Sequence, residues 1–140
     1  MRLLFTLILI AQSLVAFSQT TASIGYSTLI GTWKVLSKIE IKKSDGQVIG
    51  QNQEVYKPDE KFFEFSQNST VTISQEFGKH SEKLPVSMKG KNLYIGKIKK
   101  TKIPYLVRYD GKLLKLAKTE GKIKKGKTIL ETEEVILERK

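Results

Sequence analysis

The sequence contains no cysteine and only one histidine among its 140 residues. Without cysteine there is no disulfide scaffold, no thiolate metal site, no catalytic thiol and no lipid-modified N-terminal cysteine. A single histidine, His80, also excludes the multi-histidine sites that bind transition metals. The length is that of one domain with its own core. We therefore expect a small protein that is held together by packing alone and carries no metal and no cofactor.

Long apolar runs are missing everywhere except near the N-terminus. Met1-Arg2 precedes a mostly apolar run, Leu3–Ala16, which is shorter than the roughly 20 residues of a membrane-spanning helix. Ala16-Phe17-Ser18 places small residues at the two positions that a signal peptidase reads. We expect a signal peptide at 1–18, with an uncleaved anchor as the alternative. The mature domain, 19–140, is then periplasmic or secreted and has no transmembrane span.

After the signal, apolar and polar residues alternate with a period of two, which predicts half-buried strands. Trp33, Val35, Ile39 and Ile41 lie at odd positions, and Leu36 is out of step. Eight such segments follow one another at intervals of about ten residues. They lie near Thr32–Ile41, Lys61–Ser66, Thr70–Phe77, Glu82–Met88, Lys91–Ile98, Lys102–Tyr109, Lys112–Lys118 and Lys127–Arg139.

The connections between these segments carry turn signals. Asp110-Gly111 predicts a hairpin, because a type I′ turn needs a positive φ that glycine adopts without strain. Gly121–Gly126 predicts a lysine-rich loop, and Ser27–Ile30 predicts a helical turn. Short connections make the meander antiparallel, and closing it into a barrel removes its exposed edges. We predict an all-β, eight-stranded, antiparallel up-and-down barrel, with a two-sheet sandwich as the alternative.

The stretch Leu29-Ile30-Gly31-Thr32-Trp33-Lys34-Val35 resembles the Gly-x-Trp opening of the lipocalin and calycin superfamily. The wider pattern is similar to the small bacterial lipocalin-like domains, without the C-terminal helix and disulfide of larger lipocalins. The resemblance implies that Gly31 and Trp33 form a structural motif in which the tryptophan plugs one end of the barrel. It also implies an arginine stacked on that tryptophan. Arg139 matches by position, and a solvated penultimate charge is the alternative.

An eight-stranded barrel is either filled by side chains or holds one small ligand. The alternating pattern assigns eight side chains to the interior, as a ligand lining or as an ordinary core. They are Ile39, Phe63, Phe65, Ile73, Tyr105, Val107, Leu114 and Leu116.

The sequence gives little evidence for catalytic residues. His80 lies in a polar stretch that reads as a loop, away from any nucleophile and base pattern. The paired carboxylates Asp59-Glu60 and Glu133-Glu134 are adjacent, and adjacent strand residues point to opposite faces. We therefore expect no catalytic residues and no enzymatic activity.

Charge is unevenly distributed along the chain. The net charge is −1 over residues 19–78, +13 over residues 79–127 and −2 over residues 128–140. Two groups of lysines in the middle block predict a shared basic face. They are Lys97, Lys99, Lys100 and Lys102 at one turn, and Lys122, Lys124, Lys125 and Lys127 at another.

The basic face has three readings: solubility, docking to an anionic partner, or nucleic-acid binding. Nucleic acid is disfavoured, because export argues against it and the lysines lack interleaved aromatic residues. We therefore expect an exported, monomeric, non-catalytic barrel that binds a small hydrophobic or amphipathic molecule. The alternative is an interaction module whose basic face binds anionic lipid, glycan or an acidic protein.

Overall fold

The structure is a computed structural model that describes residues 25–140, so the predicted signal peptide lies outside the described residues. In this part of the chain no helix has the length and hydropathy that a membrane-crossing helix needs. Nine strands and two short helical turns make up the fold. Their bounds are α1 Tyr26–Leu29, β1 Gly31–Ser44, β2 Gln47–Val55, β3 Phe62–Ser66, β4 Thr70–Gln75, η1 Glu76–Gly78, β5 His80–Lys89, β6 Asn92–Ile95, β7 Tyr105–Tyr109, β8 Leu113–Lys124 and β9 Lys127–Arg139.

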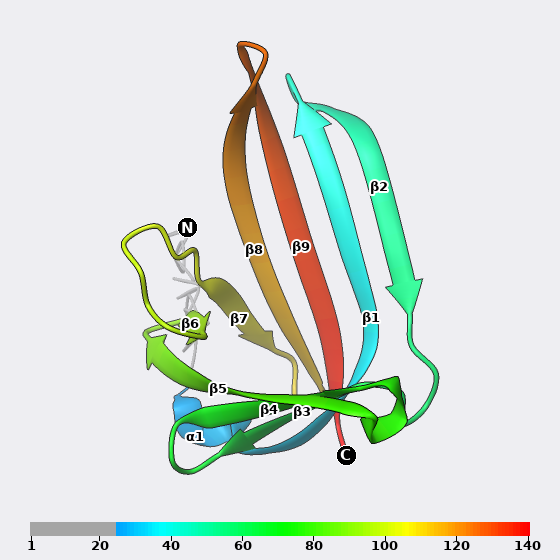
Figure 1. The fold of residues 1–140 in the computed structure, drawn as a ribbon, viewed down its shortest axis with the longest axis vertical. Coiled ribbons are helices and arrows are strands. Elements are labelled where there is room, and N and C mark those ends of the chain that lie inside the picture. Colours follow the sequence, from blue (N-terminus) through cyan, green and yellow to red (C-terminus); the bar gives the residue numbers. More distant parts are fainter. Residues whose placement is uncertain (1–24) are drawn as a thin grey trace, which may run out of the picture.

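Eight of the strands close into an antiparallel barrel, which confirms the predicted fold. The order runs β1-β3-β4-β5-β6-β7-β8-β9, and β9 pairs back onto β1. The additional strand β2 pairs only with β1. Along one side of β1, residues Gly31–Lys34 pair with β3 and residues Ser37–Ser44 pair with β2. The barrel is therefore complete at one end, while β1, β2, β8 and β9 continue past it as a taller sheet (Figure 1).

Two tight turns build this taller sheet. Asp45-Gly46 joins β1 to β2, and Lys125-Gly126 joins β8 to β9. Both central residues of each turn have positive φ, which matches the twist of the flanking strands as type I′ turns do. The prediction of a loop over Gly121–Gly126 is wrong, because β8 continues to Lys124. A hairpin does form at Asp110-Gly111, but only Gly111 has positive φ there, so the predicted type I′ turn is wrong.

A β-bulge at Leu36 decides which side chains of β1 face inward. Val35 lies opposite Leu137, but Ser37 lies opposite Ile136, so the extra residue reverses the alternation. After the bulge, Lys38 shares the inner face with buried Val135. Ile39 consequently lies on the outer face, and the prediction that it lines the interior is wrong.

The closed end of the barrel is sealed by Trp33. This side chain has no solvent exposure, and its indole Nε1 donates a hydrogen bond of 2.7 Å to the carbonyl oxygen of Leu29. The Arg139 guanidinium stacks over the indole at 4.3 Å from the ring centroid. Gly31, with a φ of +127°, brings the backbone so close to Arg139 that a β-carbon would lie 3.1 Å from Nη1. The Gly-x-Trp motif and Arg139 thus form one structural unit.

Replacing Arg139 by alanine should lower the free energy of unfolding by about 1–2 kcal/mol. The change removes the stacking on Trp33 and two hydrogen bonds, from Nη1 to the carbonyl oxygen of Ile30 at 3.1 Å and from Nη2 to that of Thr28 at 2.6 Å. Urea denaturation measures the loss. Arg139→Lys is the control, since it keeps the charge but loses the planar fork. Equal stability of wild type and the alanine variant would mean that Arg139 is only a solvated terminal charge.

Candidate binding site at the barrel mouth

The inner face of the tall sheet changes from apolar to charged where the barrel opens. On β9, Leu137 and Val135 are buried, and the next residue on the same face is Glu133. Glu133 lies opposite Glu40 of β1 and Lys118 of β8. We call this open end the mouth of the barrel.

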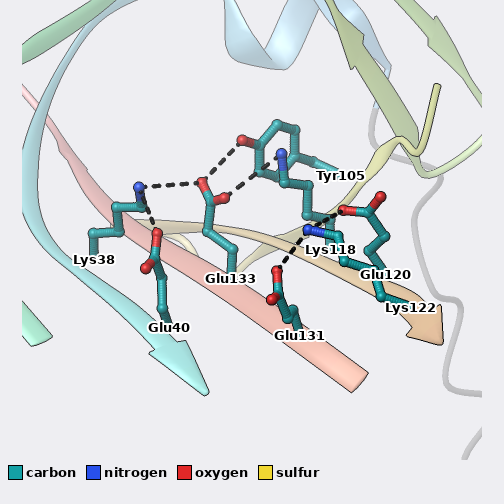
Figure 2. A network of polar contacts seen from close by, with 8 residues as sticks. All are labelled: Lys38, Glu40, Tyr105, Lys118, Glu120, Lys122, Glu131 and Glu133. Carbon is teal, nitrogen blue, oxygen red and sulfur yellow. Dashed lines mark hydrogen bonds and ion pairs between the residues drawn. The ribbon is translucent and has the colours of Figure 1, made fainter. Parts of the chain in front are cut away.

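Glu133 is the centre of a polar network at the mouth (Figure 2). Its carboxylate lies 3.5 Å from Nζ of Lys118 and 4.0 Å from Nζ of Lys38, and accepts a 3.0 Å hydrogen bond from the Tyr105 hydroxyl. Lys38 also pairs with Glu40 at 2.9 Å. The side chains come from four strands, β1, β7, β8 and β9, so only the closed barrel brings them together.

A second group of ion pairs continues the network along the tall sheet. Nζ of Lys122 lies 3.1 Å from a Glu131 carboxylate oxygen and 3.8 Å from one of Glu120, and Lys42 contacts Glu131 at 3.6 Å. The hydrogen bond from Lys122 lowers the pKa of Glu131 and raises that of Lys122. A cleft of about 190 Å³ opens among these groups. Its lining consists of Glu40, Ile41, Lys42, Lys118, Glu120, Glu131, Thr132 and Glu133.

Burial changes the pKa values of the ionisable groups nearest the barrel. It raises the pKa of the Tyr105 hydroxyl above its usual range, and the neighbouring charge of Glu133 adds to the effect. Burial alone would lower the pKa of Lys38, but the contact with Glu40 and the charge of Glu133 raise it overall. Tyr105 therefore remains a hydrogen-bond donor, and Lys38 remains a cation, at neutral pH.

Lys61 differs from the other lysines of the mouth. It lies directly before β3, two residues ahead of buried Phe63, and its Nζ lies 5.1 Å from the centroid of the Tyr56 ring. Among the described residues no carboxylate lies within ion-pair distance of it. Burial, and then the charge of Lys38, lower the pKa of Lys61, while the more distant charges of Glu54 and Glu133 partly offset this effect. Lys61 is thus a half-buried cation whose charge the protein does not neutralise by direct contact.

The neighbouring Tyr56 hydroxyl already has a partner, because it donates a 2.6 Å hydrogen bond to Glu54. Burial raises the pKa of this tyrosine, and the hydrogen bond to Glu54 has the same effect.

Most of the predicted interior residues lie in the hydrophobic core. Five of them are buried, Phe63, Phe65, Val107, Leu114 and Leu116. Ile73 and Tyr105 are half-buried and pack against this core near the mouth, while Ile39 lies outside. The clefts found among the described residues are not lined by the five buried side chains. The five buried side chains are at most 7% exposed, so the lower barrel is packed.

The two predicted groups of lysines lie on different elements. Lys97, Lys99, Lys100 and Lys102 lie in the segment between β6 and β7, whereas the other four lie on the β8–β9 hairpin, whose turn extends well beyond that segment (Figure 1). Lys99 and Lys102 border a cleft with Lys118 and Glu120 of β8. Because Lys122 is paired with Glu131, part of the basic block is neutralised by the acidic C-terminal strand.

The remaining candidates for catalysis lie apart. His80 is an exposed residue at the start of β5 and contacts Glu76 at 3.3 Å. Glu133 faces the mouth, whereas Glu134 contacts Lys115 at 3.4 Å on the outer face. The opposite orientation of this carboxylate pair is as predicted.

Comparisons with known proteins found one structural similarity to report. No protein-family model matches the chain, and no curated protein matches it. Its structure is similar to the crystal structure of a protein of unknown function from the DUF3598 family of Nostoc punctiforme, with 12% sequence identity and a TM-score of 0.46. The match covers 84% of this chain and 50% of the other, so the chain spans about half the length of that protein.

The network of the mouth was not predicted from the sequence, although a signal was present. On β8 the inward positions change from Leu114 and Leu116 to Lys118, with the period of two unbroken. On β9 they change in the same way from Val135 to Glu133. A change from apolar to charged residues on one face of two paired strands indicates where a barrel opens to solvent.

Proposed function

We propose that the protein is an exported, non-catalytic member of the lipocalin-like barrels that binds a small amphipathic molecule with an anionic group at the mouth. Lys61 carries the proposal: a half-buried cation without a direct carboxylate partner favours an anion that supplies one. Lys38 is close enough to affect the pKa of Lys61, but it is itself paired with Glu40 and Glu133, so the charge available to a ligand is that of Lys61. The signal-like N-terminus supports export, and the Gly31, Trp33 and Arg139 unit supports the lipocalin-like assignment.

The apolar part of such a ligand has less space here than it would have in a barrel with an empty interior. The lower core is packed, so the ligand lies above it, against half-buried Ile73 and Tyr105. The adjoining cleft of about 190 Å³ shares Lys118 and Glu133 with the network but is not lined by Lys61, Ile73 or Tyr105, and it is below the roughly 300–1,000 Å³ of typical drug-sized sites. We therefore propose a short-chain or compact amphipathic molecule.

The proposal is tested by titrating the protein with a short fluorescent fatty-acid analogue and with the corresponding uncharged alcohol. Lys61→Met should weaken binding of the acid about tenfold, equivalent to one charge-assisted contact of about 1.4 kcal/mol. Binding of the alcohol should change less than that, because its affinity comes from removing apolar surface from water. Lys83→Met, which removes an exposed lysine on β5, is the matched control and should leave both affinities unchanged.

Two results would count against the proposal. If the wild type binds the acid and the alcohol equally well, Lys61 does not contribute to binding. If it binds neither probe, the mouth is not a binding site for such molecules. The basic-face alternative predicts instead that the protein binds anionic vesicles in a strongly salt-dependent way. Replacing Lys122, Lys124 and Lys125 by glutamine should then abolish vesicle binding, while Lys61→Met should leave it intact.

A further inference from the structure

Two lysine-rich segments of the chain have nearly the same sequence. Residues 96–102 read GKIKKTK and residues 121–127 read GKIKKGK, so the two segments differ only at Thr101 and Gly126. Each contains four lysines, one isoleucine and no acidic residue. We call these segments the first and the second lysine turn.

Both segments form a tight turn at the same four positions. In the first, the backbone N–H of Lys102 donates a 2.9 Å hydrogen bond to the carbonyl oxygen of Lys99, which closes the turn. In the second, the matching residues Lys124 and Lys127 form the last pair of the β8–β9 ladder, on either side of its turn. The shared sequence thus has a shared local shape, although one segment is a loop between strands and the other is a hairpin.

The isoleucine directly before each turn is exposed to solvent. Ile98 is 53% exposed and Ile123 is 79% exposed, which makes Ile123 the most exposed of the large apolar side chains in residues 25–140. One exposed apolar residue alone has no special meaning. The same residue exposed at the same place in both copies of a motif indicates a shared role.

The eight lysines of the two turns are all exposed. In the described part of the chain only Lys122 among them forms ion pairs, with Glu120 and Glu131. The other seven have no carboxylate of residues 25–140 within ion-pair distance. Most of the positive charge of the two turns is therefore available to a partner.

Both turns adjoin the same edge of the tall sheet. On this edge β8 pairs with β7 only as far as Ala117. The first turn then borders a cleft of about 170 Å³ with Lys118 and Glu120 of β8, and the second turn begins at the next residue, Gly121. Figure 1 shows the segment between β6 and β7 beside β8, and the second turn at the tip of the same strand. Together the two turns form a basic edge with two exposed isoleucines.

We propose that this basic edge docks on the surface of an anionic lipid bilayer, with the lysines at the headgroups and Ile98 and Ile123 in the apolar layer below them. Exposed lysines without carboxylate partners attract an anionic surface. The isoleucines favour a bilayer over a soluble polyanion, because nucleic acids and acidic glycans have no apolar layer to receive them. Neither turn contains an aromatic residue on which bases could stack.

The basic edge is separate from the proposed ligand site, because Lys61 belongs to neither turn. Docking of the edge and binding at the mouth therefore do not exclude each other. Lys61→Met should bind vesicles like the wild type, so failure of one proposal leaves the other to be tested. Docking by charge alone would not need the isoleucines, and this difference is the basis of the experiment.

The experiment is cosedimentation with vesicles made of equal parts of phosphatidylglycerol and phosphatidylcholine. The wild type should bind these vesicles and should not bind vesicles of phosphatidylcholine alone. Lys99→Gln and Lys124→Gln, which remove one lysine from each turn and break no ion pair, should each weaken binding about fivefold. The double variant Ile98→Ser/Ile123→Ser should weaken binding about tenfold, because it removes the apolar contribution.

The matched control is Val55→Ser, which removes a side chain that is 74% exposed on β2, at the opposite edge of the tall sheet. It should bind vesicles like the wild type. All of these positions are exposed, so each variant should keep the wild-type circular dichroism spectrum. Dextran sulfate serves as a soluble polyanion, and the double isoleucine variant should bind it as well as the wild type does.

A fluorescent label measures insertion directly. Because the chain has no cysteine, Ile123→Cys and Val55→Cys each accept a single environment-sensitive label. Emission of the label at position 123 should shift to shorter wavelength when the anionic vesicles are added, and emission of the label at position 55 should not.

Three results would overturn the proposal. The first is a wild type that does not bind the anionic vesicles, and the second is equal binding to vesicles of phosphatidylcholine alone. The third is a double isoleucine variant that binds the anionic vesicles as tightly as the wild type, which would assign the basic edge to soluble polyanions such as acidic glycans or acidic proteins.

Discussion

Replacing Trp33 by alanine should lower the free energy of unfolding by about 3–5 kcal/mol, as truncation of a buried aromatic residue does. Trp33 is fully buried and lies edge-on to Tyr109, with ring centroids 6.1 Å apart. The alanine variant loses these contacts, the hydrogen bond to Leu29 and the surface on which Arg139 stacks. A cavity at the closed end of the barrel would remain.

The measurement must use circular dichroism, because Trp33 is the only tryptophan and its fluorescence disappears with it. Trp33→Phe is the control: it keeps an aromatic ring but loses the Nε1 donor, so its loss should be smaller. An unchanged urea midpoint for Trp33→Ala would contradict the role of this residue as the plug of the barrel.

Leu116→Ala should lower the free energy of unfolding by about 2–5 kcal/mol. Leu116 has no solvent exposure and lies opposite buried Val107 on β7 and Val135 on β9. Removing three carbon atoms there leaves a cavity between strands that pair on both sides. Urea denaturation measures the loss, and Lys115→Ala, the exposed-face neighbour, should change stability by much less.

The same variant separates a ligand at the mouth from a ligand inside the barrel. At temperatures where Leu116→Ala remains folded, it should bind the fatty-acid analogue with nearly wild-type affinity, because Leu116 lies in the packed part of the barrel. A large loss of affinity without loss of stability would mean that Leu116 lines a ligand cavity, as one reading of the sequence has it.

The distribution of charge along the chain differs from its distribution in the folded barrel. Along the chain, the excess of lysine over residues 79–127 is followed by four glutamates in the last thirteen residues. In the barrel, β9 lies between β8 and β1, so Glu131 and Glu133 come next to lysines of both strands. A count of charges by segment therefore overstates the basic surface wherever an acidic strand inserts between basic ones.

The register of β1 is a second place where the sequence misleads. Alternation from Trp33 places Val35, Ile39 and Ile41 on one face, and Leu36 interrupts that alternation by one position. The bulge absorbs Leu36 and turns Lys38 toward the mouth instead of Ile39. A single extra residue exchanges the two faces of every residue that follows it in the strand.

The strand β2 is absent from the sequence prediction for a related reason. Its side chains bury almost nothing, so selection for alternating apolar residues leaves little trace in Gln47–Val55. The turn Asp45-Gly46 before it was the available signal, since this dipeptide favours a two-residue hairpin. An edge strand outside the barrel core is held by backbone hydrogen bonds to β1, which do not depend on side-chain type.

The sequence by itself determined the all-β class, the antiparallel order of the barrel strands and the Trp33 plug, because these depend on local alternation, turn residues and one short motif. The tertiary structure alone decided which faces meet: the Leu36 bulge, the packed lower barrel, the Glu133 network, the position of Lys61 beyond ion-pair distance of the described carboxylates, and the open edge of β2. All but the β2 edge depend on the pairing of strands far apart in the chain. Closure of β9 onto β1 sets that pairing, and short-range periodicity carries no information about it.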